Sequence, residues 1–253
     1  MLALNAGAQF TGAPEPLFTR EGFELTVGAN HLGHFLLANL LLPAMSASGR
    51  IVVTSSEVHD PESAGGSVGP GATLGGLDGM RGGLAGMVDG GEWDGDKAYK
   101  DSKLCNLLFA REMASRLQAA GSKVTANAFG PGLITTSDFF SNNKYQKEGA
   151  IKAFSFIASK TGATETVDGG GRCLEFMALA PELEGTTGVY YNNTLRRPGK
   201  HDFRMEDGSA ESKDAAEAAE LWLLSTQLTE APEELALKWP VEPQEAAAAV
   251  VAM

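Results

Sequence analysis

The chain is poor in cysteine and in positive charge. Its 253 residues include two cysteines, Cys105 and Cys173, and its 32 acidic residues outnumber its 20 lysines and arginines, which gives a net charge of −12. Two distant cysteines supply neither a disulfide framework nor the paired spacing of a metal site, and they suit a reducing compartment. An acidic chain also lacks the basic face that binds a phosphate backbone. We therefore expect no metal and no nucleic-acid partner.

Long hydrophobic runs are missing as well. The longest, around residues 35–42, is interrupted by Asn39 and is too short to span a bilayer. Nothing at the N-terminus resembles a signal or transit peptide. We expect no transmembrane segment and a soluble intracellular protein, while peripheral association with a membrane stays open. The sequence carries no signature of an oligomeric state.

A glycine-rich turn for a nucleotide is not found in a working position. Such a turn lies between a strand and the N-terminus of a helix, where the backbone approaches the pyrophosphate. The glycines at 65–71 lie in an irregular segment, and those at 169–171 follow no expected strand. Residues 2–4, by contrast, already have the pattern of a buried strand. We therefore expect the chain to be the C-terminal part of a longer protein, with the first strands and the phosphate site absent.

Strands and helices alternate along the rest of the chain. Continuous β-branched and apolar runs are typical of buried parallel strands, and apolar residues at intervals of three and four indicate helices. The alternation predicts an α/β fold with a parallel sheet. The expected strands cover residues 2–4, 51–54, 124–129 and 188–191, and the expected helices cover residues 21–42, 98–119, 164–179 and 211–228.

One domain is expected over residues 1–230. Within it, residues 60–97 are crowded with glycines and have no sustained period, which is typical of a long insertion loop with one short helix. A helical region rich in Phe and Lys is expected to end near residue 159. Residues 231–253 hold three prolines and a run of alanines, which predicts a disordered tail.

Tyr99 and Lys103 are the residues that most clearly suggest chemistry. They stand one helical turn apart, so both side chains project from the same face of a helix. The phenol of tyrosine has a pKa near ~10, and a neighbouring ammonium group favours the phenolate and lowers that pKa. The pair is therefore a compact proton donor for the reduction of a carbonyl or an activated double bond. A solvated surface pair is the alternative, and the other motifs decide between the two.

Further motifs follow one another along the chain at regular intervals. They are Asn5-Ala6-Gly7 after the first strand, Asn30 inside a helix, Ser56 after the second strand, and Pro131-Gly132 after the third, with Thr136 beyond them. This ordered set resembles the short-chain dehydrogenase/reductase family over nearly the whole chain, up to about residue 228. The resemblance implies a Rossmann-like doubly wound parallel sheet, of which the N-terminal strands are missing here.

The resemblance also assigns roles. It implies that Tyr99 is the acid/base, and that Lys103 lowers its pKa and holds the nicotinamide ribose of NADPH. Ser56 would hydrogen-bond the substrate or Tyr99, and Asn30 would take part in a proton relay. The residues expected around the cofactor are Asn5, Ala6, Gly7, Tyr99, Lys103, Pro131, Gly132 and Thr136. Two alternatives remain open: Asn30 as a buried amide bonded to the backbone, and Ser56 as a turn cap.

Within the family, residues 87–106 are similar to light-dependent NADPH:protochlorophyllide oxidoreductases, which also have a long insertion before the tyrosine. That branch implies a tetrapyrrole pigment as the small-molecule substrate and a plastid (chloroplast) location. Leu133, however, stands where those enzymes have a cysteine, and Ser56 matches retinol-dehydrogenase-like members. A retinol- or lipid-aldehyde reductase therefore remains an alternative, and so does an inactive binding module without a cofactor.

Overall fold

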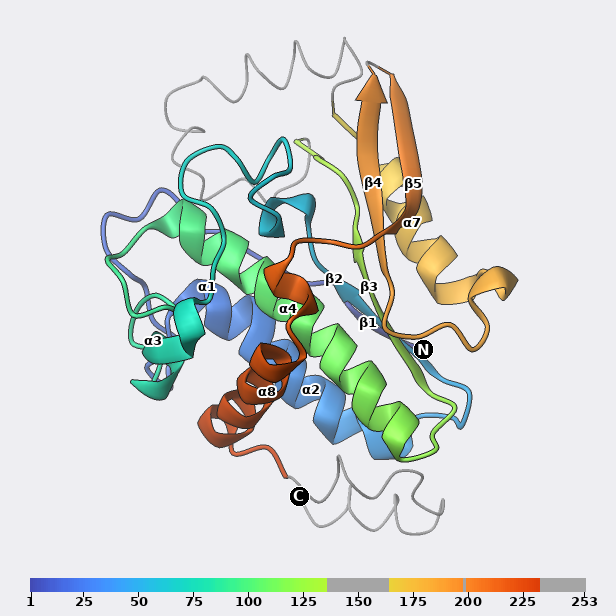
Figure 1. The fold of residues 1–253 in the computed structure, drawn as a ribbon, viewed down its shortest axis with the longest axis horizontal. Coiled ribbons are helices and arrows are strands. Elements are labelled where there is room, and N and C mark those ends of the chain that lie inside the picture. The colour runs from blue at the N-terminus through green and yellow to red at the C-terminus, as the bar shows by residue number, and fades with distance from the viewer. Residues whose placement is uncertain (136–163, 198, 233–253) are drawn as a thin grey trace.

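A five-stranded sheet forms the centre of the molecule in the computed structural model, which describes residues 1–135, 164–197 and 199–232 (Figure 1). The strands lie side by side in the order β1-β2-β3-β4-β5. The first four are parallel to one another, and β5 is antiparallel to β4. Their bounds are Leu2–Leu4, Arg50–Thr54, Thr125–Gly130, Tyr190–Arg197 and Lys200–Glu206. The predicted α/β fold is confirmed, whereas β5 and the second half of β4 were not predicted.

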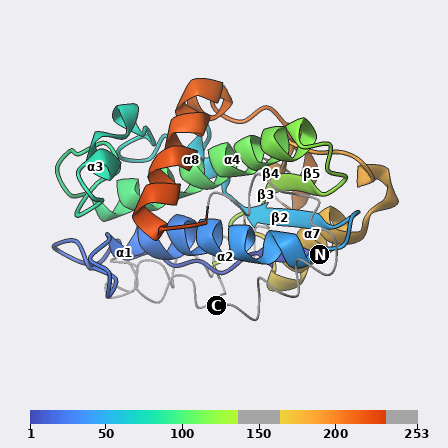
Figure 2. The same cartoon turned by 90° about the horizontal axis from the view of Figure 1, so that it is seen from below.

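Helices cover both faces of the sheet, as a doubly wound fold requires. The helices are α1 (Leu25–Val27), α2 (Gly33–Leu41), α3 (Asp78–Arg81), α4 (Gly95–Ala119), α7 (Val167–Leu179) and α8 (Ala215–Thr229). Ile51 and Val53 of β2 pack with α2 and α4, whereas Val52 between them packs with α7 on the other face. Because side chains alternate along a strand, an unbroken apolar run serves both layers. Figure 2 shows α2, α4 and α8 grouped beside the sheet.

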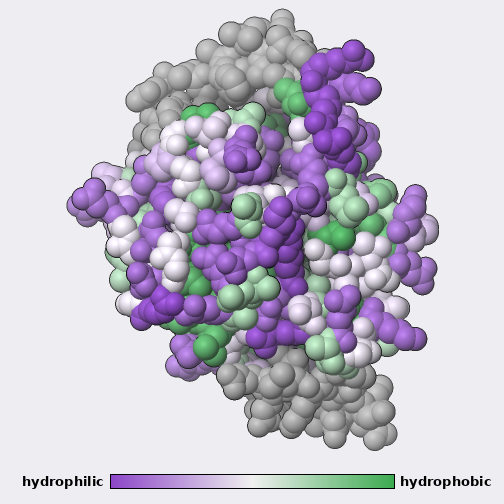
Figure 3. Space-filling view, in the orientation of Figure 1, coloured by the Kyte–Doolittle hydropathy of each residue, from purple (hydrophilic) through white to green (hydrophobic). Residues whose placement is uncertain are grey.

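The first helical region starts later than the sequence predicts. Glu24 caps it, since its two carboxylate oxygens accept hydrogen bonds from the N–H groups of Thr26 and Val27, both at 2.8 Å. A π-helical turn, Gly28–Leu32, then separates α1 from α2. The segment Leu25–Ala44 is long and apolar enough to cross a membrane by composition, but 61% of it is buried as a core helix. On the face shown in Figure 3, polar side chains predominate and apolar ones are scattered.

The insertion is more ordered than the predicted loop. It contains α3, and its apolar side chains Leu74, Leu77, Met80 and Val88 are buried in one cluster with residues of α4 and α8. Burial of this kind is what fixes an irregular segment in place, because each apolar side chain removed from water adds about 1.5–3 kcal/mol. The insertion is therefore a folded layer over the first half of α4.

Two further helix boundaries differ from the predictions. Helix α7 begins at Val167 with Thr166 as its N-cap, because the Thr166 hydroxyl accepts from the N–H of Gly169 at 2.9 Å. The expected C-terminal helix is divided at Asp214, which caps α8 through two backbone N–H groups. The Phe- and Lys-rich region before residue 159 and nearly all of the expected tail, residues 233–253, lie outside the described residues.

Candidate active site

The predicted site residues gather where the parallel strands end. Asn5 follows β1, Ser56 follows β2 and Pro131 follows β3, while Tyr99 and Lys103 lie on the first turns of α4 (Figure 1). The carboxyl edge of an open parallel sheet is where such folds bind ligands. The structure therefore places chemistry-bearing side chains from four separate segments at one edge of the sheet.

Tyr99 and Lys103 are in contact, as their spacing predicts. The Lys103 ammonium nitrogen lies 5.5 Å from the centre of the Tyr99 ring. Tyr99 is half-buried and its side chain is hydrogen-bonded to Ser56, which links α4 to the end of β2. Asp94 begins the helix by accepting a hydrogen bond from the Lys97 N–H at 2.9 Å, four residues before Lys100 and next to this pair. The three residues Ser56, Tyr99 and Lys103 thus form one continuous group.

The pKa of Tyr99 runs opposite to the prediction. Burial raises the pKa of Tyr99 above its ordinary value, and the hydrogen bond from Ser56 only partly offsets this. Lys103 does not lower it, so the expected direction is wrong for this structure. The physical reason is that the phenolate would be desolvated, and the cation beside it faces the ring rather than the hydroxyl. At neutral pH the tyrosine therefore keeps its proton.

Lys103 is a buried cation with few partners. Its side chain is 3% exposed, and burial lowers its pKa to about 8. Among the described residues its ammonium group has one hydrogen-bond acceptor, the Thr54 carbonyl at 3.3 Å. An ammonium group carries three donors, so capacity remains for a ligand's hydroxyl groups.

Gly7 leaves the space in which such a ligand would lie. A Cβ atom added to Gly7 would meet the Lys103 ammonium nitrogen at 3.4 Å and the Asn30 amide oxygen at 3.3 Å. Asn5 is held beside it by the Thr54 hydroxyl, which donates to the Asn5 amide oxygen at 2.8 Å. This arrangement fits a sugar with vicinal hydroxyl groups. Within the described residues, no group of three metal-binding side chains is present.

Asn30 holds the turn after β1 against α4. Its amide accepts from the N–H of Ala8 and donates to the carbonyl of the same residue, both at 2.8 Å. The amide also donates to the hydroxyl of Ser102 at 3.0 Å, and that hydroxyl donates to the Tyr99 carbonyl at 2.7 Å. This is the arrangement of the alternative, a buried amide bonded to the backbone, and a part in a proton relay stays a prediction. Asn30 lies in the π-helical turn, a feature often found at functional sites.

Ser56 combines the two functions that the sequence left open. Its hydroxyl accepts from the N–H of Val58 at 3.5 Å and so caps the short turn Glu57–His59, and its side chain also bonds Tyr99. Pro131 and Gly132 lie in the turn after β3. Gly132 has a φ of +88°, where a side chain would be strained. Thr136 lies outside the described residues.

Asn193 of β4 supports the Pro131-Gly132 turn and was not predicted. Its amide donates to the Pro131 carbonyl at 3.1 Å and to the Glu165 carboxylate at 2.9 Å. A Cβ atom on Gly132 would lie 3.2 Å from that amide nitrogen. No local sequence signal marks Asn193, because its partners lie far away along the chain.

Comparison with known proteins identifies relatives, although no family model matches the chain. The chloroplastic protochlorophyllide reductase of Cucumis sativus is 37% identical over 237 residues, which cover 90% of this chain and 57% of that protein. The protochlorophyllide reductase of Avena sativa is 35% identical, with 90% of this chain and 74% of that protein covered. An uncharacterised protein from Mycobacterium paratuberculosis, of solved structure, has 29% identity and a TM-score of 0.57, with 91% and 66% coverage. The chain belongs to the short-chain dehydrogenase/reductase family.

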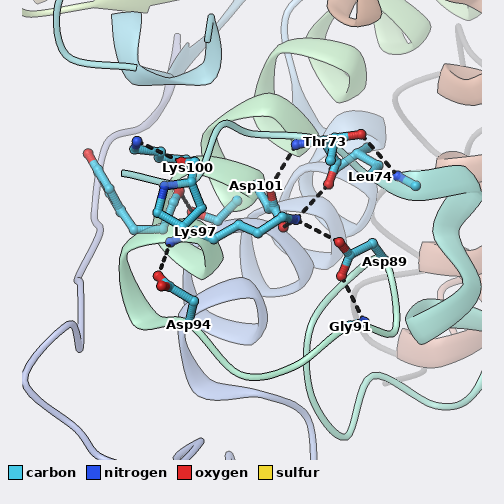
Figure 4. Close-up of polar contacts among 12 residues, drawn as sticks. Thr73, Leu74, Asp89, Gly91, Asp94, Lys97, Lys100 and Asp101 are labelled. Carbon is cyan, nitrogen blue, oxygen red and sulfur yellow. Dashed lines mark hydrogen bonds and ion pairs between the residues drawn. The ribbon is translucent and has the colours of Figure 1, made fainter. Parts of the chain in front are cut away.

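This short-chain dehydrogenase/reductase fastens its insertion to α4 through charged residues on either side of Tyr99 (Figure 4). The Lys97 ammonium group lies 2.6 Å from the Asp101 carboxylate and 2.9 Å from that of Asp89. Asp101 also accepts from the N–H of Thr73 at 3.1 Å, and burial raises its pKa to about 7. The insertion is therefore attached to the same helical turn that carries the tyrosine. None of these fastening residues was predicted.

Lys100 makes the densest of these contacts. Its ammonium group donates to the carbonyl oxygens of Gly66, Val68 and Pro70 at 2.9, 2.6 and 2.8 Å, and the residue is buried. One side chain thus satisfies three carbonyls of an irregular segment. The cage holds the outer strand of the insertion next to Tyr99.

Replacement of Lys100 by methionine is expected to lower the free energy of unfolding by about 2 kcal/mol, because carbonyl groups that stay buried lose their donor. Urea unfolding measures this change. Lys123→Met, at an exposed position after α4, is the control and is expected to have little effect. Equal stability of the Lys100 and Lys123 variants would show that the cage contributes nothing.

Proposed function

We propose that this chain carries the acid/base residues of an NADPH-dependent oxidoreductase that reduces protochlorophyllide to chlorophyllide in a light-dependent reaction. The observation that carries the proposal is the contact of Ser56, Tyr99 and Lys103 at the carboxyl edge of the sheet. The names of the relatives support the substrate, and the chain spans 57% of the length of the first of them. A plastid location is part of the proposal, since those relatives are called chloroplastic.

Tyr99 is the proton donor in this proposal. When NADPH is bound, it supplies a hydride to one carbon of the pigment's double bond and becomes NADP⁺. The Tyr99 hydroxyl then gives its proton to the other carbon, so that two electrons and two hydrogens are added in all. Burial keeps the hydroxyl protonated until it is needed, because it raises the pKa of Tyr99. The Ser56 hydroxyl orients the phenol.

Lys103 has two functions in the proposed reaction. Its positive charge stabilises the phenolate that remains after proton transfer, since an opposite charge nearby favours the ionised form. Its unused donors, beside the space above Gly7, would hold the ribose of the cofactor. Asn5 and the Pro131-Gly132 turn would border the same cofactor. The folded insertion would form one wall of the pocket for a large pigment.

A reductase that acts in the dark on retinol or a lipid aldehyde is the second candidate. It is favoured by Leu133, which follows the Pro131-Gly132 turn and is 39% exposed. An exposed leucine offers an apolar contact to a substrate but no thiol that could donate a proton. Ser56 also suits this second reaction, because a hydroxyl at that place can hydrogen-bond a carbonyl oxygen.

One assay separates the candidates. The protein is mixed with NADPH and protochlorophyllide, and chlorophyllide formation is followed by absorbance in matched light and dark samples. The proposal expects product in light alone, whereas consumption of NADPH with retinal in the dark favours the second candidate. A parallel fluorescence titration measures NADPH binding. Failure to bind NADPH would contradict both candidates and favour a binding module without a cofactor.

A further inference from the structure

His59 lies directly behind Ser56 and is almost completely buried, with 1% of its surface exposed. Its ring nitrogen Nδ1 is 2.5 Å from the Ser56 carbonyl oxygen, and its Nε2 is 3.2 Å from the backbone nitrogen of Ser209. A backbone N–H can only donate, so Nε2 accepts. Nδ1 must then carry the hydrogen and donate it to the Ser56 carbonyl. The two partners therefore fix the ring in one neutral tautomer.

The ring has no room to move. Tyr190 packs edge-on against it, with the ring centres 5.1 Å apart and an angle of 85° between the planes. Gly208 closes the other side, where an added Cβ atom would lie 2.9 Å from Nε2. Gly208 also has a φ of +74°, which a residue with a side chain rarely adopts. The position thus has the shape of a neutral imidazole.

The segment that supplies the second partner is itself attached to the helix of the site. Arg111 of α4 donates to the Ser212 hydroxyl at 2.9 Å and to the Asp207 carbonyl at 2.5 Å. His59 therefore connects Ser56 at the end of β2, through the 207–212 segment, to the same helix that carries Tyr99. Burial lowers the pKa of His59, in agreement with a neutral ring.

We propose that His59 is a positioning residue: as the Nδ1–H tautomer it pins the Ser56 carbonyl and so holds the Ser56 hydroxyl against Tyr99. The inference rests on the proposed function for its catalytic consequence, but its structural content stands on the hydrogen bonds alone. His59 touches neither the substrate nor the reacting atoms. It acts through Ser56, because a misplacement of about 1 Å near reacting groups can cost about 10²-fold in rate.

Two substitutions separate the two bonds of the ring. In His59→Asn the amide nitrogen replaces Nδ1 and can still donate to Ser56. In His59→Gln the longer side chain places an oxygen near Nε2, where it accepts from Ser209 but leaves Ser56 unheld. We expect kcat to fall by less than about threefold in the asparagine variant and by about tenfold or more in the glutamine variant, with KM for NADPH unchanged in both.

A readout that needs no turnover is the tautomer of His59 in the wild-type protein. The ¹⁵N chemical shifts of the ring should show Nδ1 protonated and Nε2 as an acceptor, and crystal structures of the two variants should show Ser56 displaced in His59→Gln alone. A protonated Nε2, or an unmoved Ser56 in both variants, overturns the inference whatever the activity. An inactive wild-type protein with the expected tautomer and displacement would contradict the proposed function and support the positioning by His59.

Discussion

Replacement of Tyr99 by phenylalanine is expected to lower kcat by about 10²–10⁴-fold, the usual contribution of a positioned proton donor. The change removes one oxygen and keeps the ring, so the packing of the ring beside Lys103 survives. Binding of NADPH and pigment should weaken little, because the proposed contacts to the cofactor come mainly from Lys103 and the turns after β1 and β3. Steady-state kinetics and fluorescence titration measure the two quantities separately.

Tyr191→Phe is the matched control for this experiment. Tyr191 lies on β4 with its ring against Phe176 and Phe203, on the α7 side of the sheet. Loss of its hydroxyl should leave kcat unchanged. Full turnover in the Tyr99 variant would remove Tyr99 from the mechanism, and an equal loss in both variants would point to a general effect on folding.

Strands β1 to β3 could be located from the sequence because their apolar runs serve two layers at once. Val52 and Ile51 of β2 face opposite helices, so no polar residue interrupts the run. Strand β5 has the opposite character. Its residues are mostly charged, and it is held by its antiparallel pairing with β4, to which it is joined by a short turn at Gly199 with a φ of +75°. Local pattern therefore predicts interior strands and misses an edge strand.

The acid/base residues were predictable because one helical turn fixes their relative position. Lys103 follows Tyr99 by four residues, and the helix itself brings the two side chains together. The supporting residues were not predictable in this way. His59 is bonded to Ser209, and Asn193 to Pro131 and Glu165, across long stretches of sequence. A contact that depends on the folding of distant segments leaves no local pattern.

The error over the Tyr99 pKa has a similar origin. Spacing predicts that a cation is near, but not how much water either group loses. In the structure burial is the largest influence on both groups: it raises the pKa of Tyr99 and lowers that of Lys103. Both shifts favour the uncharged form, as desolvation must. The site therefore spends stability in order to keep a charge beside the phenol.

That conclusion leads to a large effect on stability. Lys103→Met is expected to raise the free energy of unfolding at pH 7 by about 3 kcal/mol, while turnover falls by about 10²-fold. The stabilisation follows from the pKa of Lys103, which burial lowers from 10.5 to about 8. Methionine has a similar length and no charge, and it leaves only the long contact with the Thr54 carbonyl unmade. Such an exchange of stability for activity is common at functional sites.

The pH dependence gives the decisive test of this charge effect. Below pH 8 Lys103 is protonated in both the folded and the unfolded wild-type protein, so the whole penalty is present. Between pH 8 and 10.5 the unfolded chain binds more protons than the folded one, and wild-type stability rises with pH relative to the variant. Urea unfolding at pH 7 and pH 10 should therefore show the advantage of Lys103→Met shrinking, whereas Lys123→Met stays close to the wild type at both. A variant less stable than the wild type at pH 7 would mean that the buried charge is compensated by contacts stronger than the single bond to Thr54.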